Sequence, residues 1–164
     1  MNSQKIDEST FRTASGLWAT GVSIVTTADL SDNPFGLTMN SVTSLSLHPP
    51  MFLVCVDLGS DTMQPMLERG AFCINVLTEA QKDLSNRFAK KGKNKFEGVD
   101  WSPGVTLTPV LKDSFLSIEC NTSNVYEGGD HRVVCGEVSQ LHFNSDPLSK
   151  PLIYFQGKYN ALMD

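Results

Sequence analysis

Residues 37–56 read Leu-Thr-Met-Asn-Ser-Val-Thr-Ser-Leu-Ser-Leu-His-Pro-Pro-Met-Phe-Leu-Val-Cys-Val, and this stretch carries the main fold signal of the chain. Its first part, 37–47, alternates loosely between apolar and hydroxyl-bearing residues until a proline pair halts the pattern. Its last part, Met51–Val56, is a continuous apolar run of strand length, which predicts a strand buried on both faces. A polar strand face followed directly by a buried strand points to a fold rich in β-structure.

Runs of β-branched and apolar residues predict further strands on both sides of this stretch. These strands are expected at 22–27, 72–77, 115–120 and 133–138, with edge segments at 141–143 and 152–155. Helices are expected at 11–19 behind a Ser9-Thr10 cap, after Thr62, and from a Thr78/Gln81 capping box to about Lys91. The strands do not alternate regularly with helices, which argues against a doubly wound parallel sheet. The prediction is a mainly β fold, a small antiparallel barrel with a few helices.

Length and charge narrow the class of protein. A chain of 164 residues favours one domain over residues 1–164, with its core at about 11–159. The net charge of −5 gives no positive field for nucleic acid. No segment has the roughly 20 apolar residues of a membrane helix, and the polar start lacks the apolar core of a signal peptide. We therefore expect a cytoplasmic protein that binds neither nucleic acid nor membrane.

The cysteines and histidines give no sign of a metal site. The four cysteines are far apart in apolar segments, and the three histidines lack ligand spacing. We expect buried, reduced thiols and no bound metal.

The densest candidate site is the polar stretch itself. Residues 38–46 hold five hydroxyls and one amide, directly before the buried strand. One interpretation is a solvated strand face. The other is a hydrogen-bonding wall for a planar heteroaromatic ligand that carries carbonyls and ring nitrogens.

Three shorter stretches also allow chemistry. Residues 57–62 join a strand to a helix start, which suits either an anion or a plain helix cap. Residues 86–96 mix basic residues with Phe88 and Phe96. The basic residues could pair with phosphates while the phenylalanines pack on a ring, or the stretch is simply the charged end of a helix. His131 follows a Gly129-Asp130 turn. It is either a histidine at the rim of a cleft, where it can do polar work near pH 7, or an ordinary turn histidine in water.

In their order and spacing these motifs resemble the short-chain flavin reductase family, the reductase components of two-component flavin-dependent monooxygenases. The resemblance covers about residues 11–159. The matching motifs are Ala19-Thr20-Gly21-Val22, Thr38-x-Asn40-Ser41-x-x-Ser44-x-Ser46-Leu47-x-Pro49-Pro50, Phe72-x-Ile74-Asn75-Val76-Leu77, Phe88-Ala89, Gly129-Asp130-His131 and Pro151-Leu152-x-Tyr154-x-x-Gly157-x-Tyr159.

The resemblance implies an FMN-binding split β-barrel, Greek-key-like and antiparallel, and a homodimer with flavin near the subunit interface. It implies that Thr38, Asn40 and Ser41 face the isoalloxazine ring, and that Ser44, Leu45 and Ser46 line the ribityl chain. By the same resemblance Leu58, Ser60 and Thr62 lie by the phosphate, and Phe88 and Ala89 close the far side. Met39 and Tyr159 complete the implied flavin site, and His131 contacts the nicotinamide cofactor without acting as an essential base.

The implied activity is an NAD(P)H:flavin oxidoreductase. Hydride passes from NADH or NADPH to FMN or FAD, and reduced flavin leaves for an oxygenase component. Hydrogen-bond donors near flavin N1 and O2 are expected to favour the reduced form. The alternatives are a flavin-binding redox sensor or carrier without NAD(P)H turnover, a relative of the pyridoxamine phosphate oxidases, and an interaction module without flavin.

Overall fold

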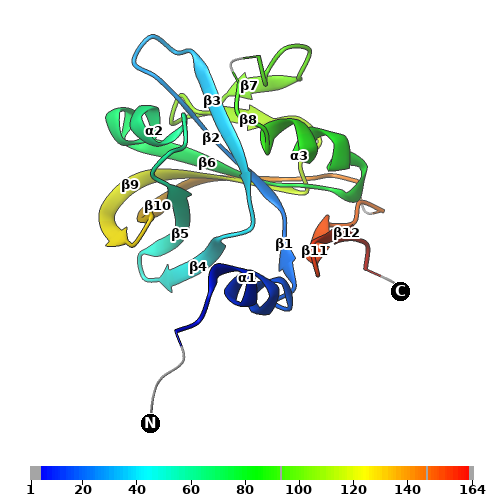
Figure 1. Ribbon diagram of the computed structural model, residues 1–164. Coiled ribbons are helices and arrows are strands. Elements are labelled where there is room, and N and C mark those ends of the chain that lie inside the picture. The colour runs from blue at the N-terminus through cyan, green and yellow to red at the C-terminus, as the bar shows by residue number, and fades with distance from the viewer. Residues whose placement is uncertain (1–4, 93, 147, 163–164) are drawn as a thin grey trace.

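The computed structural model describes residues 5–92, 94–146 and 148–162, and in these residues antiparallel strands predominate (Figure 1). The largest sheet has seven strands in the order β3-β2-β6-β9-β10-β5-β4. Their bounds are β2 Ser23–Ala28, β3 Pro34–Met39, β4 Val42–Leu47, β5 Pro50–Asp57, β6 Ala71–Val76, β9 Leu116–Gly128 and β10 His131–Phe143. The predicted mainly β, antiparallel fold is confirmed.

Two small sheets accompany the large one. Three strands pair in the order β1-β11-β12, with bounds Thr20–Gly21, Ile153–Phe155 and Lys158–Asn160. Strands β7 (Trp101–Pro103) and β8 (Pro109–Leu111) form a hairpin that the sequence pattern did not predict.

The connection between β3 and β4 explains why the large sheet curls. These strands lie at opposite ends of the strand order, yet only Asn40 and Ser41 separate them in the chain. The steps from Met39 to Val42 span at most about 11 Å, so the two edges of the sheet must come together. The Cys55 N–H donates to the Ser41 carbonyl at 3.0 Å and fixes this corner against β5. The stretch 37–47, which the sequence pattern did not divide, therefore belongs to two strands that close a barrel.

The hairpin β9–β10 is longer than its apolar runs. The two strands pair from His131↔Gly128 to Phe143↔Leu116. The predicted strands 115–120 and 133–138 are too short, and 141–143 is the end of β10 rather than a separate edge segment. Cross-strand pairing carries both strands into polar sequence that hydrophobicity alone does not mark.

The helices differ from prediction mainly at their ends. Helix α1 (Glu8–Gly16) begins before the predicted Phe11, because the Asp7 carboxylate caps it by accepting from the Thr10 N–H at 2.8 Å. Helix α2 (Met63–Arg69) follows Thr62 as predicted, and Gly70 is its C-cap. The short helix η1 (Glu79–Gln81) carries the predicted Thr78/Gln81 capping box, and α3 (Lys82–Phe88) follows it. Helix α3 ends before the predicted Lys91.

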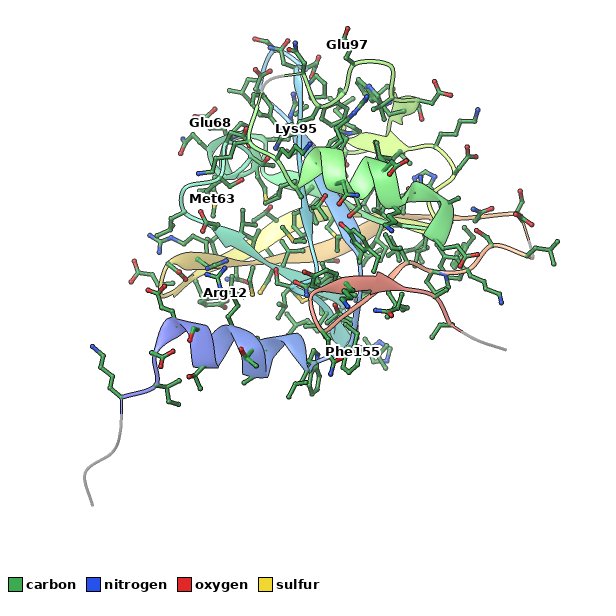
Figure 2. All side chains as sticks on the ribbon, turned by 45° about the vertical axis from the view of Figure 1, so that its right-hand side comes forward. Arg12, Met63, Glu68, Lys95, Glu97 and Phe155 are labelled. Carbon is green, nitrogen blue, oxygen red and sulfur yellow. The ribbon has the colours of Figure 1, made fainter. Side chains whose placement is uncertain are left out.

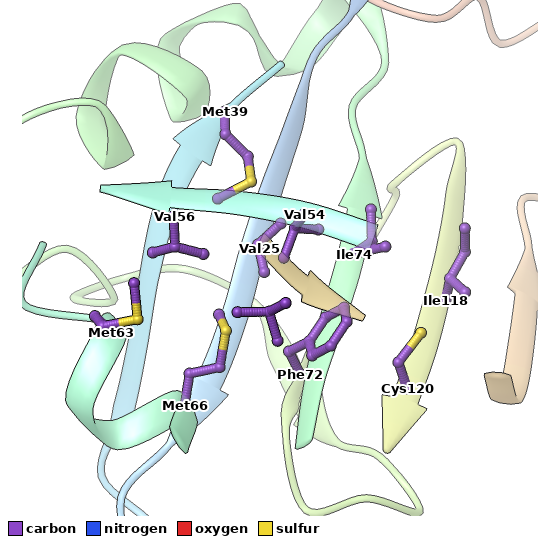
Figure 3. Packing of buried hydrophobic residues seen from close by; sticks show 11 residues of the cluster. Val25, Met39, Val54, Val56, Met63, Met66, Phe72, Ile74, Ile118 and Cys120 are labelled. Carbon is purple, nitrogen blue, oxygen red and sulfur yellow. The ribbon is translucent and has the colours of Figure 1, made fainter. Parts of the chain in front are cut away.

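Two apolar clusters hold the barrel together. The larger one fills its inside with valines and isoleucines of the sheet, Phe72, and the two buried methionines of α2, Met63 and Met66 (Figure 3). Gly136 of β10 lets Phe72 pack closely, since a Cβ there would lie 2.7 Å from the phenyl ring. The second cluster joins β2, α3 and β8 around Phe88. Together they fix the strands that carry the β3–β4 corner.

The four cysteines are free, and three of them are buried. The exception is Cys55, which is half-buried. Among the buried cysteines, burial raises the pKa of the Cys120 thiol to about 12. Among the described residues no helix has both the length and the apolar character to cross a bilayer. Nor do the described residues hold a group of three or more His, Cys, Asp or Glu side chains arranged for a metal ion.

Candidate active site at the barrel corner

Thr38, near the end of β3, is tied to α3 by its hydroxyl. Its Oγ1 donates to the Ser85 carbonyl at 2.7 Å, and the Ser85 hydroxyl lies 2.8 Å from the Tyr159 hydroxyl. The structure therefore brings Thr38 and Tyr159 together through Ser85. Sequence reasoning missed Ser85, because nothing around it in the helix distinguishes it from an ordinary buried serine.

Ser41 is fixed in the same way on the other side of the corner. Its hydroxyl donates to the Cys55 carbonyl at 2.9 Å and lies 3.9 Å from the Met39 sulfur. Met39 is buried in the main cluster, whereas Asn40 between them is exposed. Because the hydroxyl protons of Thr38 and Ser41 are engaged by carbonyls, their oxygens offer lone pairs to a ligand. These two hydroxyls are therefore available to a ligand as acceptors.

Strand β4 adds hydroxyls next to a bulge. Its register against β5 shifts between Ser44 and Ser46, so Leu45 is the extra residue. A bulge re-aims side chains and is common beside functional sites. Ser44 and Leu45 are exposed, while the half-buried Ser46 accepts from the His48 N–H at 3.2 Å and keeps its own proton for a ligand.

The loop after β5 is arranged differently from the predicted anion site. The N–H of Leu58 donates to the Asp130 carbonyl, that of Gly59 to the Asp57 carboxylate, and that of Ser60 to the Asp57 carbonyl. The N–H of Thr62 donates to the Ser60 hydroxyl, and Thr62 itself is buried. These four amides are therefore engaged within the protein, so a phosphate at this loop would need side-chain partners.

Two lysines supply positive charge at this loop instead. The Lys95 amine bridges the Asp61 carboxylate at 3.5 Å and the Gly36 carbonyl at 3.1 Å. The Lys91 amine lies 3.8 Å from where a Cβ on Gly59 would stand. With the Ser60 hydroxyl, these amines are the groups of the loop region that suit a phosphate.

His131 stands at the start of β10, beside the same loop. Its backbone pairs with Asp57 of β5, and its Nδ1–H donates to the Asp130 carboxylate at 2.7 Å. That bond, the largest influence on the carboxyl group, holds the pKa of Asp130 below its usual value. A carboxylate on Nδ1 fixes the ring orientation and leaves Nε2 for a second partner.

Phe88 and Ala89 occupy different environments. Phe88 is 1% exposed and packs edge-to-face on Phe96, with ring centroids 4.9 Å apart. Ala89 is exposed at the end of α3. The Phe88 ring lies in the core, so it does not face a ligand directly. It supports the site by holding β3 and the segment after α3 in place.

The residues on both sides of the β3–β4 corner carry hydrogen-bond acceptors as well as donors. Thr38 and Ser41 offer acceptors, while Ser44, Ser46 and the Asn40 amide offer donors. An isoalloxazine ring has an N–H between two carbonyls, so it needs both kinds of partner. The donor and acceptor set fits a flavin, and at the loop two amines and a hydroxyl fit its phosphate.

The comparison with known families agrees with this geometry. Residues 15–163 match the family described as the flavin reductase like domain. The chain belongs to this family. Flavin reductases of this family share its fold, so the curled sheet is the flavin reductase split barrel.

Several flavin reductase relatives span nearly the whole chain. The reductase subunit HsaB of a flavin-dependent monooxygenase from Mycobacterium tuberculosis is 39% identical over 160 residues, which is 98% of this chain and 85% of that protein. A flavin reductase (NADH) from Kitasatospora aureofaciens is 35% identical over 156 residues, with 94% and 81% covered.

Solved structures of the family superimpose closely. Nitrilotriacetate monooxygenase component B from Mycobacterium thermoresistibile has a TM-score of 0.91 and 36% identity, and covers 96% of this chain and 87% of that one. An NADH:FAD oxidoreductase from Streptomyces globisporus, in complex with NAD and FAD fragments, has a TM-score of 0.89 and 29% identity, with 98% of each chain covered.

Proposed function

We propose that this flavin reductase transfers hydride from NAD(P)H to a flavin and supplies the reduced flavin to a partner oxygenase. One observation carries the proposal. The flavin-compatible wall at the β3–β4 corner and the His131 turn are linked through the β5 loop, where Leu58 N–H donates to the Asp130 carbonyl at 3.0 Å. A site that transfers hydride must hold two ring systems against each other, and this loop joins the groups suited to each.

The chain's own residues would position both partners. Thr38, Asn40 and Ser41 would meet the ring, and Ser44, Leu45 and Ser46 its side chain. Ser60 and the two lysines would meet the phosphate, with Leu58 covering it. His131 would orient the nicotinamide, held by Asp130. The flavin supplies the hydride-accepting chemistry when bound, so the protein needs no general base.

We also propose one domain over residues 1–164, with its core at about 11–159, and a homodimer. Helix α1 buries none of its residues, and Trp18 just after it is 77% exposed. Phe11 and Leu17 are also exposed, and Figure 1 shows α1 at the end of the barrel near β4. Apolar surface of this kind suits a protein interface. A second copy over this face would also cover the open wall at Asn40 and Leu45.

Sedimentation velocity tests the dimer. We expect a dimer for the natural chain and a monomer for Trp18→Asp, since a charge at the interface is not tolerated. A natural chain that sediments as a monomer at micromolar concentration would exclude the homodimer.

A cytoplasmic location stays a prediction from sequence, to be checked by cell fractionation.

The activity is tested by following NADH and NADPH oxidation with and without added FMN or FAD. We expect rapid oxidation that depends on added flavin. Tight flavin binding without NAD(P)H oxidation by folded protein would favour the sensor or carrier. Transfer of the reduced flavin is tested by coupling to an oxygenase kept in a separate dialysis chamber.

A further inference from the structure

The hydroxyl of Tyr159, on the last strand β12, meets helix α3 at a fully buried serine. The Tyr159 hydroxyl lies 2.8 Å from the hydroxyl of Ser85. A hydroxyl that is buried without a hydrogen-bond partner costs free energy, so this contact fixes where Ser85 stands. In Figure 2 the hairpin β11–β12, in which Phe155 is labelled, lies below α3.

The hairpin that carries Tyr159 is anchored to the body of the fold. Leu152, directly before β11, is buried, and its N–H donates to the Leu77 carbonyl at 2.8 Å. The Tyr159 ring packs edge-to-face on Tyr154 with ring centroids 5.6 Å apart, and the Lys82 amine lies 5.9 Å from the centroid of the Tyr159 ring. Both the backbone and the ring of Tyr159 are therefore held in place, so its hydroxyl is a fixed point against which α3 rests.

Helix α3 in turn contacts β3 at two points. At the first, the Ser85 carbonyl accepts from the Thr38 hydroxyl at 2.7 Å. At the second, one helical turn later, the Phe88 ring lies so close to Gly36 that a Cβ there would stand 2.9 Å from it. Packing fixes the second point by shape. The first point is a single hydrogen bond, which weakens steeply when its distance or angle changes, so it depends on the position of Ser85.

We propose that Tyr159 is a positioning residue of the flavin site and makes no contact with the flavin itself. Its hydroxyl holds Ser85, the Ser85 carbonyl engages the Thr38 proton, and the Thr38 oxygen then faces the flavin as an acceptor. The inference rests on the proposed function, because it concerns flavin binding at that site. It differs from the direct place in the flavin site that the family resemblance implies for Tyr159.

A double-mutant cycle separates the indirect role from a direct contact, because it measures whether two residues act through each other. A direct contact between Tyr159 and the flavin acts whether or not residue 38 carries a hydroxyl. The indirect role works through the Thr38 hydroxyl alone. Its effect therefore disappears once that hydroxyl has been removed.

The test measures the dissociation constants of FMN and FAD by flavin fluorescence titration. The cycle consists of the natural chain, Tyr159→Phe, Thr38→Val and the double variant, and Tyr159→Phe removes the hydroxyl while it keeps the ring. Ser85→Ala breaks the same contact from the helix side. Tyr154→Phe is the matched control, since the Tyr154 hydroxyl has no hydrogen bond among the described residues. Urea denaturation establishes that each variant is folded under the conditions of the titration.

We expect Tyr159→Phe and Ser85→Ala each to raise the flavin dissociation constant about fivefold, and Tyr154→Phe to leave it unchanged. In the Thr38→Val background, Tyr159→Phe should have no further effect. The same rise in both backgrounds, an unchanged dissociation constant for Tyr159→Phe, or an equal rise for Tyr154→Phe overturns the positioning role alone. A folded natural chain that binds neither FMN nor FAD overturns the proposed function as well.

Discussion

Thr38 of β3 and Ser85 of α3 are joined by a 2.7 Å hydrogen bond from the threonine hydroxyl to the serine carbonyl. The two residues are 47 positions apart in the chain. Ser85 in turn lies 2.8 Å from Tyr159, so α3, β3 and β12 meet at one point. Because a carbonyl takes its proton, Thr38 can only accept from a ligand. This contact sets both the position and the polarity of the hydroxyl in the proposed flavin site.

Replacing Thr38 with valine keeps the shape of the side chain and removes the acceptor. We expect Thr38→Val to raise the flavin dissociation constant about tenfold, since one hydrogen bond to the flavin is lost and the tie from β3 to the Ser85 carbonyl, which then accepts only from the Ala89 N–H, is broken. Thr38→Ser keeps the hydroxyl and should stay near the natural value. Flavin fluorescence titration measures both. Equal flavin affinities for the valine and serine variants would show that the Thr38 hydroxyl does not contact the flavin.

His131 is expected to act on the reductant alone. His131→Ala should raise the Michaelis constant for NADH about tenfold, while the flavin dissociation constant stays unchanged. Asp130→Asn should give a smaller change, because the ring keeps its place but loses its carboxylate partner. His48→Ala is the control, since His48 is exposed and belongs to no proposed contact. An unchanged Michaelis constant and turnover for His131→Ala would refute the role.

Some elements could be predicted because their signals are local. The apolar run 51–56 is the core of β5, and the Thr78/Gln81 spacing is the capping box of η1. In each case the residues that decide the structure are neighbours in the chain. The barrel closure was not predictable in this way, because it depends on which strands pair with β3 and β4, and the corner at Asn40 carries no break in the hydroxyl-rich pattern.

The site shows the same division. The hydroxyls of 38–46 are visible as a cluster in the sequence, but their donor or acceptor character depends on carbonyls of Ser85 and Cys55. The β5 loop has small residues like those of an anion site, yet its amides are engaged by Asp57 and Asp130. Residue types predict which groups are present, whereas tertiary contacts decide which of their atoms remain free.

Gly136 is expected to be intolerant of any side chain. A Cβ there would lie 2.7 Å from both Phe72 and the Cys120 Cβ, in the buried centre of the main cluster. Gly136→Ala should lower the free energy of unfolding by about 1–3 kcal/mol, because the core cannot relax without moving a strand. Gly21→Ala is the matched control, since nothing lies within 4 Å of its Cβ position. Urea denaturation of both variants measures the difference.

Glu119 is expected to make the stability of the barrel depend on pH. Its side chain is fully buried, with the Thr106 N–H and hydroxyl on one carboxylate oxygen and His142 on the other. Burial by itself raises the pKa of Glu119, but the Thr106 and His142 hydrogen bonds outweigh it and hold the pKa below the usual 4.5. The folded state therefore favours the ionised carboxylate more than the unfolded chain does.

The sign of the pH effect follows from that lowered pKa. The stabilisation is fully present above the unfolded pKa and is lost as the pH falls through the folded pKa. Glu119→Gln should cost about 2 kcal/mol of unfolding free energy at neutral pH, since hydrogen bonds to a charged acceptor become neutral ones. The difference from the natural chain should shrink in acid below the usual carboxyl range. Glu137→Gln, at an exposed position of β10, is the control and should show no such pH dependence. A Glu119→Gln deficit that stays constant from neutral pH into acid would mean that the network stabilises the fold by shape rather than by charge.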